Sequence, residues 1–382
     1  MLDQSLLKLT AQLVKNGIRY HYLRATGKPG KPAAVSLEVT HECIAQCVMC
    51  NIWKIPRDVP NLSLEDWVAL LSSDLFSDLK ELDITGGSRF CASDLGELIA
   101  RICQLKADKL KHLDSIAITT NGLMTRRVIS QTETMLTRLQ NAGLQLVMVC
   151  AMDAVGPLHD EIRHVKNAWT RVNETIQALK QLRSRFLNLI IGLKTTVLLM
   201  NVQELERIVE YATDNGLFTI LSPCIITEGR YLNPDRADDL VFSPQALSAM
   251  QAFFEHSTSG WDYHDQQLIR YCQTGETHKP CSCGFNYCFV RSNGDLFLCP
   301  LLNSRVGNIR EQSAEVLFNS QAASQVRRQI GRRPECRSCT EPGLERYSLP
   351  YEGLAYLGLL PKMGKQAFLE QHYRMGLDKY FD

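Results

Sequence analysis

Three cysteines, Cys43, Cys47 and Cys50, form a C-x3-C-x2-C spacing directly after a strand-like stretch at residues 35–40. A cube-shaped cluster of four irons and four sulfides needs a ligand on each iron, and cysteine thiolate is the usual one. Three thiolates therefore leave one iron open to a ligand that is not protein. The spacing predicts a [4Fe–4S] cluster that chelates a small molecule at its fourth iron.

A structural zinc site is the alternative for the same cysteines, because zinc also binds thiolates and closes its shell with four ligands. His41 would then be the fourth ligand. The triplet lies at a strand-to-loop turn in a parallel-sheet pattern, and not in a small cross-linked module, which favours the cluster.

Disulfides are disfavoured, because the N-terminus carries no secretory signal and no run of eighteen apolar residues marks a membrane span. These features predict a cytoplasmic protein, in which cysteine clusters more often bind metal than form cross-links. Five further cysteines stand alone in helix or strand patterns and are predicted to be core residues: Cys91, Cys103, Cys150, Cys224 and Cys272.

The 382 residues, 45% hydrophobic and 22% charged, are enough for one large domain and a smaller one. A net charge of +1 gives no reason to expect a nucleic-acid partner. Residues 1–34 are nevertheless basic, with apolar residues at roughly helical spacing between the bases. This segment predicts either a peripheral contact with an anionic membrane or a helix that packs on the main domain with a solvated basic face.

Short apolar runs alternate with amphipathic stretches from residue 33 to about residue 225. Such a βα series predicts parallel strands covered by helices, here a partial (β/α)6 TIM-like barrel. In these barrels the reactive ends are the strand C-termini. Four candidate segments follow successive strands and should share that rim: Cys43, Gly86-Gly87, Asn121-Gly122 and Asp153.

An irregular charged segment at residues 228–240 precedes Ser243-Pro244, a good start for a helix. We therefore predict an N-terminal helix at residues 1–32, a barrel at 33–240 and a smaller hairpin-and-helix domain at 241–382. Asn293-Gly294 between apolar flanks predicts a β-hairpin, which would bring Cys281 and Cys299 toward each other.

The triplet, Thr85-Gly86-Gly87 and the segment from Ala151 to Arg163 closely resemble the radical S-adenosylmethionine (SAM) superfamily. The resemblance implies that SAM binds the open iron and is cleaved reductively to methionine and a 5′-deoxyadenosyl radical. That radical would remove hydrogen from an unactivated C–H bond. It also implies a flavodoxin- or ferredoxin-type reductant.

The same resemblance assigns SAM contacts. Gly86 and Gly87 would offer backbone to the SAM amino group, but Ser88-Arg89 replaces the usual Glu-Pro, so Ser88 is the remaining side-chain partner. Arg163, beyond Asp153 in the fourth-strand segment, would hold the SAM carboxylate, since guanidinium grips carboxylates bidentately; the alternative is an ion pair with Asp160 or Glu161. Contacts with ribose and adenine fall on Asn121 and Thr195.

Cys281, Cys299, Cys336 and Cys339 resemble the twitch and SPASM extensions of this superfamily, and imply one fully ligated auxiliary [4Fe–4S] cluster. Cys283 also fits the spacing before Gly294. Cys288 is open to three interpretations: a further ligand, a catalytic hydrogen-atom donor that faces the substrate, or an inert buried thiol.

A fully ligated cluster has electron transfer as its natural task, so the resemblance implies oxidation or epimerisation of a small sugar-like or lipid-linked molecule. The alternatives are modification of a ribosomal peptide or a tetrapyrrole, and a non-catalytic iron–sulfur electron carrier.

Overall fold

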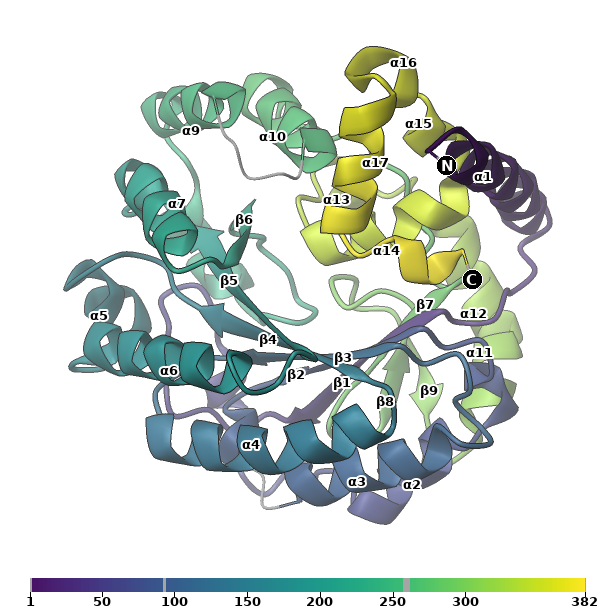
Figure 1. Ribbon diagram of the computed structural model, residues 1–382, viewed down its shortest axis with the longest axis horizontal. Helices are drawn as coiled ribbons and strands as arrows, with labels where there is room; N and C mark the ends of the chain where they lie inside the picture. The colour runs from purple at the N-terminus through teal and green to yellow at the C-terminus, as the bar shows by residue number, and fades with distance from the viewer. Residues whose placement is uncertain (1, 92–93, 257–261, 382) are drawn as a thin grey trace.

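The computed structural model describes residues 2–91, 94–256 and 262–381, apart from the side chains of residues 2–5 and of Cys91. One nine-stranded sheet runs through the molecule in the order β6-β5-β4-β3-β2-β1-β7-β8-β9. Its first six strands are parallel and curve into a partial barrel (Figure 1). They are β1 (Ala34–Thr40), β2 (Glu81–Gly86), β3 (Ser115–Thr120), β4 (Gln145–Ala151), β5 (Leu189–Val197) and β6 (Phe218–Pro223).

Helices connect these strands and cover the convex face of the sheet (Figure 1). They are α2 (Leu64–Leu71), α3 (Leu95–Leu105), α4 (Thr125–Asn141), α5 (Leu158–Arg163), α6 (Ala168–Arg183) and α7 (Leu205–Asp214). The βα alternation read from the sequence is confirmed. The sequence pattern predicts strands at residues 35–40, 79–84, 115–119, 144–150, 189–199 and 218–221, and each is present with its ends shifted by at most two residues. The helix predicted at residues 129–142 is α4, which begins four residues earlier.

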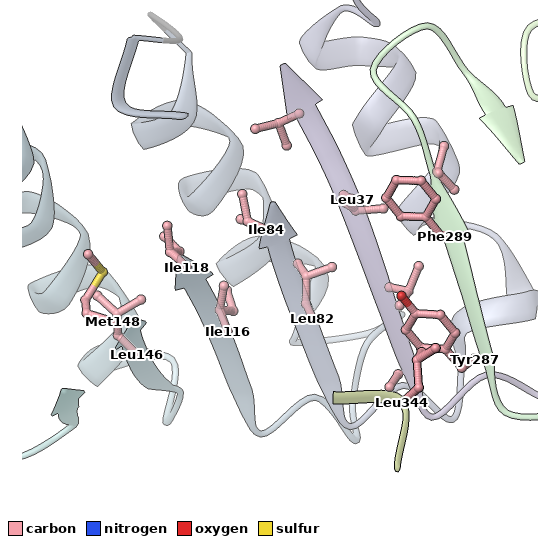
Figure 2. Packing of buried hydrophobic residues seen from close by; sticks show 14 of the residues in the cluster. Leu37, Leu82, Ile84, Ile116, Ile118, Leu146, Met148, Tyr287, Phe289 and Leu344 are labelled. Carbon is pink, nitrogen blue, oxygen red and sulfur yellow. The ribbon is translucent and has the colours of Figure 1, made fainter. Parts of the chain in front are cut away.

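The two faces of the sheet differ in burial because alternate side chains point to opposite sides. Apolar side chains on neighbouring strands align in register and lie buried against the helices (Figure 2): Leu82, Ile84, Ile116, Ile118, Leu146 and Met148. The positions between them are partly exposed, among them Asp83, Ala117 and Lys194. The concave face of the barrel is therefore accessible at its centre.

The predicted hairpin forms and extends the barrel sheet. β7 (Tyr287–Val290) pairs in parallel with β1, and β8 (Asp295–Phe297) and β9 (Arg305–Asn308) follow it antiparallel. Gly294 has φ +94° in the turn, a conformation that glycine adopts without strain. The hairpin strands thus belong to the same sheet as the barrel, and the domain division at residue 240 stays a prediction.

The remaining helices precede β1 or follow β6 in the sequence, and α1 (Leu2–Thr26) lies beside the C-terminal helices on the open side of the barrel (Figure 1). α1 packs on α14 (Pro342–Glu352) and α15 (Leu354–Leu357). The others are α8 (Ala237–Leu240), α9 (Pro244–His256), α10 (Asp262–Thr274), α11 (Ala314–Asn319), α12 (Gln321–Gln329), α13 (Pro334–Arg337), α16 (Leu360–Met363) and α17 (Lys365–Arg374). Among the described residues, no helix has both the length and the apolar character needed to cross a bilayer.

Candidate active site

The triplet lies in the loop that follows β1 at the C-terminal rim of the barrel. Two neighbouring segments hold this loop by hydrogen bonds. Val48 N donates to the Ile162 carbonyl at the end of α5 (3.0 Å), and the Asn233 side chain donates to the Met49 carbonyl (2.8 Å). The three thiols stand close enough to interact electrostatically with one another. The fold therefore presents Cys43, Cys47 and Cys50 as one group on a braced loop.

Gly86 and Gly87 allow the second rim loop to approach the triplet loop. A Cβ on Gly86 would lie 2.2 Å from the Thr40 carbonyl oxygen, and one on Gly87 would lie 2.0 Å from that of Glu42. Any larger residue would thus push the two loops apart. The close approach lets Ser88 N donate to the Glu42 carbonyl (2.6 Å).

Ser88 and Asn121 meet beside the triplet, as their places in the sequence predicted. The Ser88 hydroxyl lies 3.7 Å from the Cys43 sulfur and accepts a hydrogen bond from Asn121 Nδ2 at 3.1 Å. It also accepts from Ile44 N at 3.1 Å. Ser88 therefore ties the triplet loop to the rims of β2 and β3, and the assignment of both residues to SAM contacts stays a prediction.

Arg163 and Asp153 form a buried ion pair at the same rim. Arg163 Nη2 lies 2.6 Å from Asp153 Oδ2, and its Nη1 lies 3.6 Å from the Cys47 sulfur. Burial raises the pKa of Asp153, and Arg163 opposes that rise. Neither alternative partner named above binds the guanidinium; Asp160 instead accepts from the backbone of Asn167 and Trp169. The arginine is thus fixed beside the triplet, where its predicted grip on a carboxylate remains a proposal.

Replacing Asp153 with alanine is expected to destabilise the apoprotein by about 3–5 kcal/mol, because it leaves the Arg163 charge buried without a partner. The measurement is the denaturant midpoint of the metal-free chain. Glu161→Gln is the matched control, since Glu161 is exposed on α5, the helix that carries Arg163. An Asp153→Ala midpoint equal to that of the control would contradict this role.

Thr195 and His41 do not face the places expected of them. Thr195 is buried, and its hydroxyl donates to the Met152 carbonyl at 2.6 Å, while its neighbours Lys194 and Thr196 occupy the partly exposed positions of β5. The alternation of the strand thus turns Thr195 away from the barrel interior. His41, the candidate fourth zinc ligand, has its Nδ1 3.2 Å from the Ser292 hydroxyl at the β7–β8 turn.

The C-terminal cysteines also gather, around one end of the hairpin. The Cys283 thiol lies beside both Cys281 and Cys299, and Cys336 and Cys339 both lie close enough to Cys281 and Cys299 to interact electrostatically. The neighbouring Cys283 thiol lowers the pKa of Cys281 to about 7, whereas burial raises the pKa of Cys339 to about 12. Five thiols therefore stand together, one more than a four-iron cluster requires.

Cys281, Cys299, Cys336 and Cys339 line a cavity of about 900 Å³. Charged groups of both signs share its wall, including Arg270, Lys279, Glu228 and Glu276. The cavity also reaches Cys224, directly after β6, which packs in one cluster with Ala45 and Met49 of the triplet loop. Cys224 was predicted to be a core residue on its isolated position, but the fold places it between the two groups of cysteines.

Cys288 lies elsewhere. It pairs with Val35 across β7 and β1, is fully buried in the main core, and stands beside Arg327 of α12. The described residues that line the 900 Å³ cavity do not include it. This placement does not support the interpretation that Cys288 faces the substrate, and its role as a hydrogen-atom donor stays a prediction.

Sequence reasoning missed a set of charged groups inside the barrel. Lys194 Nζ lies 3.5 Å from Glu341 Oε1, and Arg230 lies near Asp83 and Glu341. Burial alone would raise the pKa of Glu341, but Lys194 and Arg230 lower it to about 2, so it is ionised at neutral pH. The available signal was a charged residue in the interior of each of two strands, Asp83 in β2 and Lys194 in β5.

The donor sets fit iron–sulfur clusters by their chemistry. Three thiols on the rim loop match a cluster with one free iron, and the five C-terminal thiols are enough to give every iron of a second cluster a protein ligand. Within the described ranges no three His, Cys, Asp or Glu side chains are grouped so as to hold a single metal ion. A four-iron cluster takes its thiolates on separate irons, so its ligands stand farther apart than those of one ion.

Comparisons with known proteins match these two groups of cysteines to two families. The radical SAM superfamily model matches residues 37–212, and the SPASM model, an iron–sulfur cluster-binding domain, matches residues 281–340. The chain belongs to the radical SAM superfamily. Its cofactors are a SAM-binding [4Fe–4S] cluster, an auxiliary [4Fe–4S] cluster and SAM.

Curated proteins similar to this chain match it at low sequence identity. The sporulation killing factor maturation protein SkfB of Bacillus subtilis is 21% identical over 74% of this chain and 63% of its own length. The AdoMet-dependent heme synthase of Methanosarcina barkeri is 24% identical over 81% of this chain and 88% of its own. The chain thus spans about three-fifths of the length of the first of these relatives.

A solved structure confirms the fold class. Streptococcus suis SuiB bound to SAM superposes with a TM-score of 0.58 at 15% identity, over 90% of this chain and 78% of that one. SuiB has also been solved with its precursor peptide SuiA. This likeness establishes the partial barrel with a C-terminal extension for this radical SAM enzyme.

Proposed function

We propose that this radical SAM enzyme modifies a peptide, with Cys43, Cys47 and Cys50 as ligands of the SAM-binding cluster and the C-terminal cysteines as ligands of the auxiliary cluster. The observation that carries the proposal is the 900 Å³ cavity lined by the auxiliary cysteines, which extends to Cys224 beside the triplet loop. Relatives that mature peptides, SkfB among them, support a peptide over the sugar-like or lipid-linked molecule expected from the sequence.

The cavity wall suits an extended polar chain. Its size is at the upper end for small-molecule pockets, and its lining offers donors and acceptors of both charges. A peptide backbone presents one donor and one acceptor per residue, all of which need partners when they leave water. When bound, the SAM-binding cluster and SAM supply the radical that abstracts hydrogen. The chain's own residues hold the reacting segment beside the triplet and exclude water.

A second candidate function is the modification of a tetrapyrrole. The heme synthase relative favours it, because the match covers 88% of that protein's length. Both candidates require the same two clusters, so they differ only in what the cavity receives.

Mass spectrometry separates the two candidates. The reconstituted chain, with SAM and dithionite, is incubated either with synthetic peptides encoded beside its gene or with a carboxylated tetrapyrrole. We expect 5′-deoxyadenosine formation to rise with a peptide, together with loss of two hydrogens from that peptide or, in deuterated water, exchange at one carbon. Loss of carbon dioxide from the tetrapyrrole with no change in any peptide would overturn the proposal in favour of the second candidate.

Arg270→Met is expected to lower peptide product by about tenfold or more, since Arg270 lines the cavity and a lost hydrogen bond from a charged group costs roughly 1.5–3 kcal/mol. Formation of 5′-deoxyadenosine without peptide should stay unchanged, because the described residues that line this cavity do not include the triplet. Lys166→Met, at an exposed lysine, is the matched control. Equal loss of both activities in the Arg270 variant would indicate a role in SAM binding instead.

A further inference from the structure

The N-terminal helix exposes an apolar face as well as burying one. Four of its large hydrophobic side chains are exposed: Leu7 by 69%, Val14 by 37%, Ile18 by 64% and Tyr22 by 54%. With the exposed Ala11, their spacing places them on one side of the helix, over a length of about 22 Å. We call these five residues the outer face of α1.

The opposite face fixes the helix to the protein. Leu6, Leu9 and Leu13 are buried among residues of the C-terminal helices. A Cβ on Gly17 would lie 2.7 Å from the Leu354 side chain, so the backbones of α1 and α15 approach closely. Tyr20 donates a hydrogen bond to the Cys281 carbonyl at 2.7 Å. The outer face is therefore held in place, at the edge of the molecule (Figure 1).

A row of cations borders the outer face. Lys8, Lys15 and Arg19 are exposed and lie along one edge of it. Residues 4–26 include no aspartate or glutamate, and the nearby Glu352 is engaged with His21 at 3.4 Å. The helix therefore combines an apolar ridge with positive charge on its outward side.

We propose that the outer face of α1 docks on an anionic membrane surface. A helix that lies in the plane of a bilayer inserts its apolar side and directs lysine and arginine to the lipid headgroups. A convex ridge fits a deformable lipid surface, whereas a bound peptide helix needs a groove. In an antiparallel pair of two copies, the cationic rows would face each other and repel.

Docking would set the cavity close to the bilayer. Tyr20, His21 and Arg24 of the same helix belong to the wall of the 900 Å³ cavity. The substrate would then enter and leave near the lipid surface. This inference rests on α1 alone and is independent of the choice between peptide and tetrapyrrole.

Vesicle sedimentation of the reconstituted protein tests the inference. The protein is expected to bind phosphatidylcholine vesicles that contain phosphatidylserine, and to bind phosphatidylcholine alone far more weakly. A triple variant should weaken vesicle binding about a hundredfold: Lys8→Gln/Lys15→Gln/Arg19→Gln. The reason is that each cation near an anionic surface raises the binding affinity by roughly tenfold or slightly less. Leu7→Ser/Ile18→Ser should weaken it comparably through the lost apolar contact.

Two control variants and two alternative binding partners of the outer face complete the test. Leu187→Ser and Lys166→Gln change an exposed apolar residue and an exposed lysine elsewhere, and both should bind vesicles like the parent chain. Absence of binding to the anionic vesicles, or full binding by the charge variant, would overturn the proposal. Two other results would also overturn the proposal. If light scattering shows a dimer that the Leu7→Ser/Ile18→Ser variant no longer forms, the occupant of the outer face is a second copy of the chain. If that variant loses peptide modification in the absence of vesicles, the occupant is a peptide.

Discussion

Replacing Cys47 with alanine is expected to abolish SAM cleavage, with 5′-deoxyadenosine falling to the background of the protein-free reaction. The physical reason is that the SAM-binding cluster has no spare thiolate: three cysteines already leave one iron without a protein ligand. The iron content should fall from about eight to about four atoms per chain, because the auxiliary cluster remains. Iron analysis and chromatographic quantification of 5′-deoxyadenosine measure both effects after anaerobic reconstitution.

Cys103→Ala is the matched control for this variant. Cys103 is a partly buried thiol on α3, outside both groups of cysteines, so its loss should leave iron and cleavage unchanged. Persistent cleavage in the Cys47 variant would refute the role of the triplet. A parent chain that binds iron but never cleaves SAM would instead point to the electron carrier.

Replacing Cys339 with alanine is expected to abolish product formation and to leave SAM cleavage intact. The auxiliary cluster should be lost, so that iron again falls to about four atoms per chain, while SAM cleavage continues. Product formation should fall to background, because an electron released after hydrogen abstraction would have no acceptor beside the cavity, and an electron consumed at that step would have no donor there. Comparison of 5′-deoxyadenosine with modified substrate measures this uncoupling.

Cys272→Ala provides the comparison for Cys339→Ala, since Cys272 is a partly buried thiol on α10 with its pKa raised by burial to about 11. It should retain both clusters and full product formation. An unchanged iron content in the Cys339 variant would remove that cysteine from the ligand set. The fifth thiol, Cys283, would then be the candidate for its place.

Much of the site could be predicted from local patterns because chemistry and turn geometry leave short-range marks. The C-x3-C-x2-C spacing places three thiols on one loop whatever the rest of the chain does. Asn293-Gly294 similarly determines the turn that brings Cys281 and Cys299 together. Likewise, the βα period assigns Cys43, Ser88 and Asn121 to one rim, since parallel strands end at the same edge of a sheet.

Other features depended on the folded arrangement of segments, which the local sequence pattern does not specify. Arg163 binds Asp153, ten residues earlier, and not its neighbours Asp160 or Glu161, because α5 directs its side chain back toward the triplet loop. The surroundings of Thr195, Cys224 and Cys288 were likewise set by which segments became neighbours. A shift of one residue in the pairing of two strands moves each side chain to the other face of the sheet, and the local spacing of residues does not specify that pairing.

The sequence alone determined the class of this protein: its cysteine spacings specify two iron–sulfur clusters and its alternation specifies the barrel. Only the tertiary structure decided the surroundings of those clusters. It brought Lys194 and Glu341, 147 residues apart in the sequence, into one charged interior, and turned the outer face of α1 to solvent. The physical reason is that ligand identity is a property of single residues, whereas burial and ion pairing arise only when remote segments pack together.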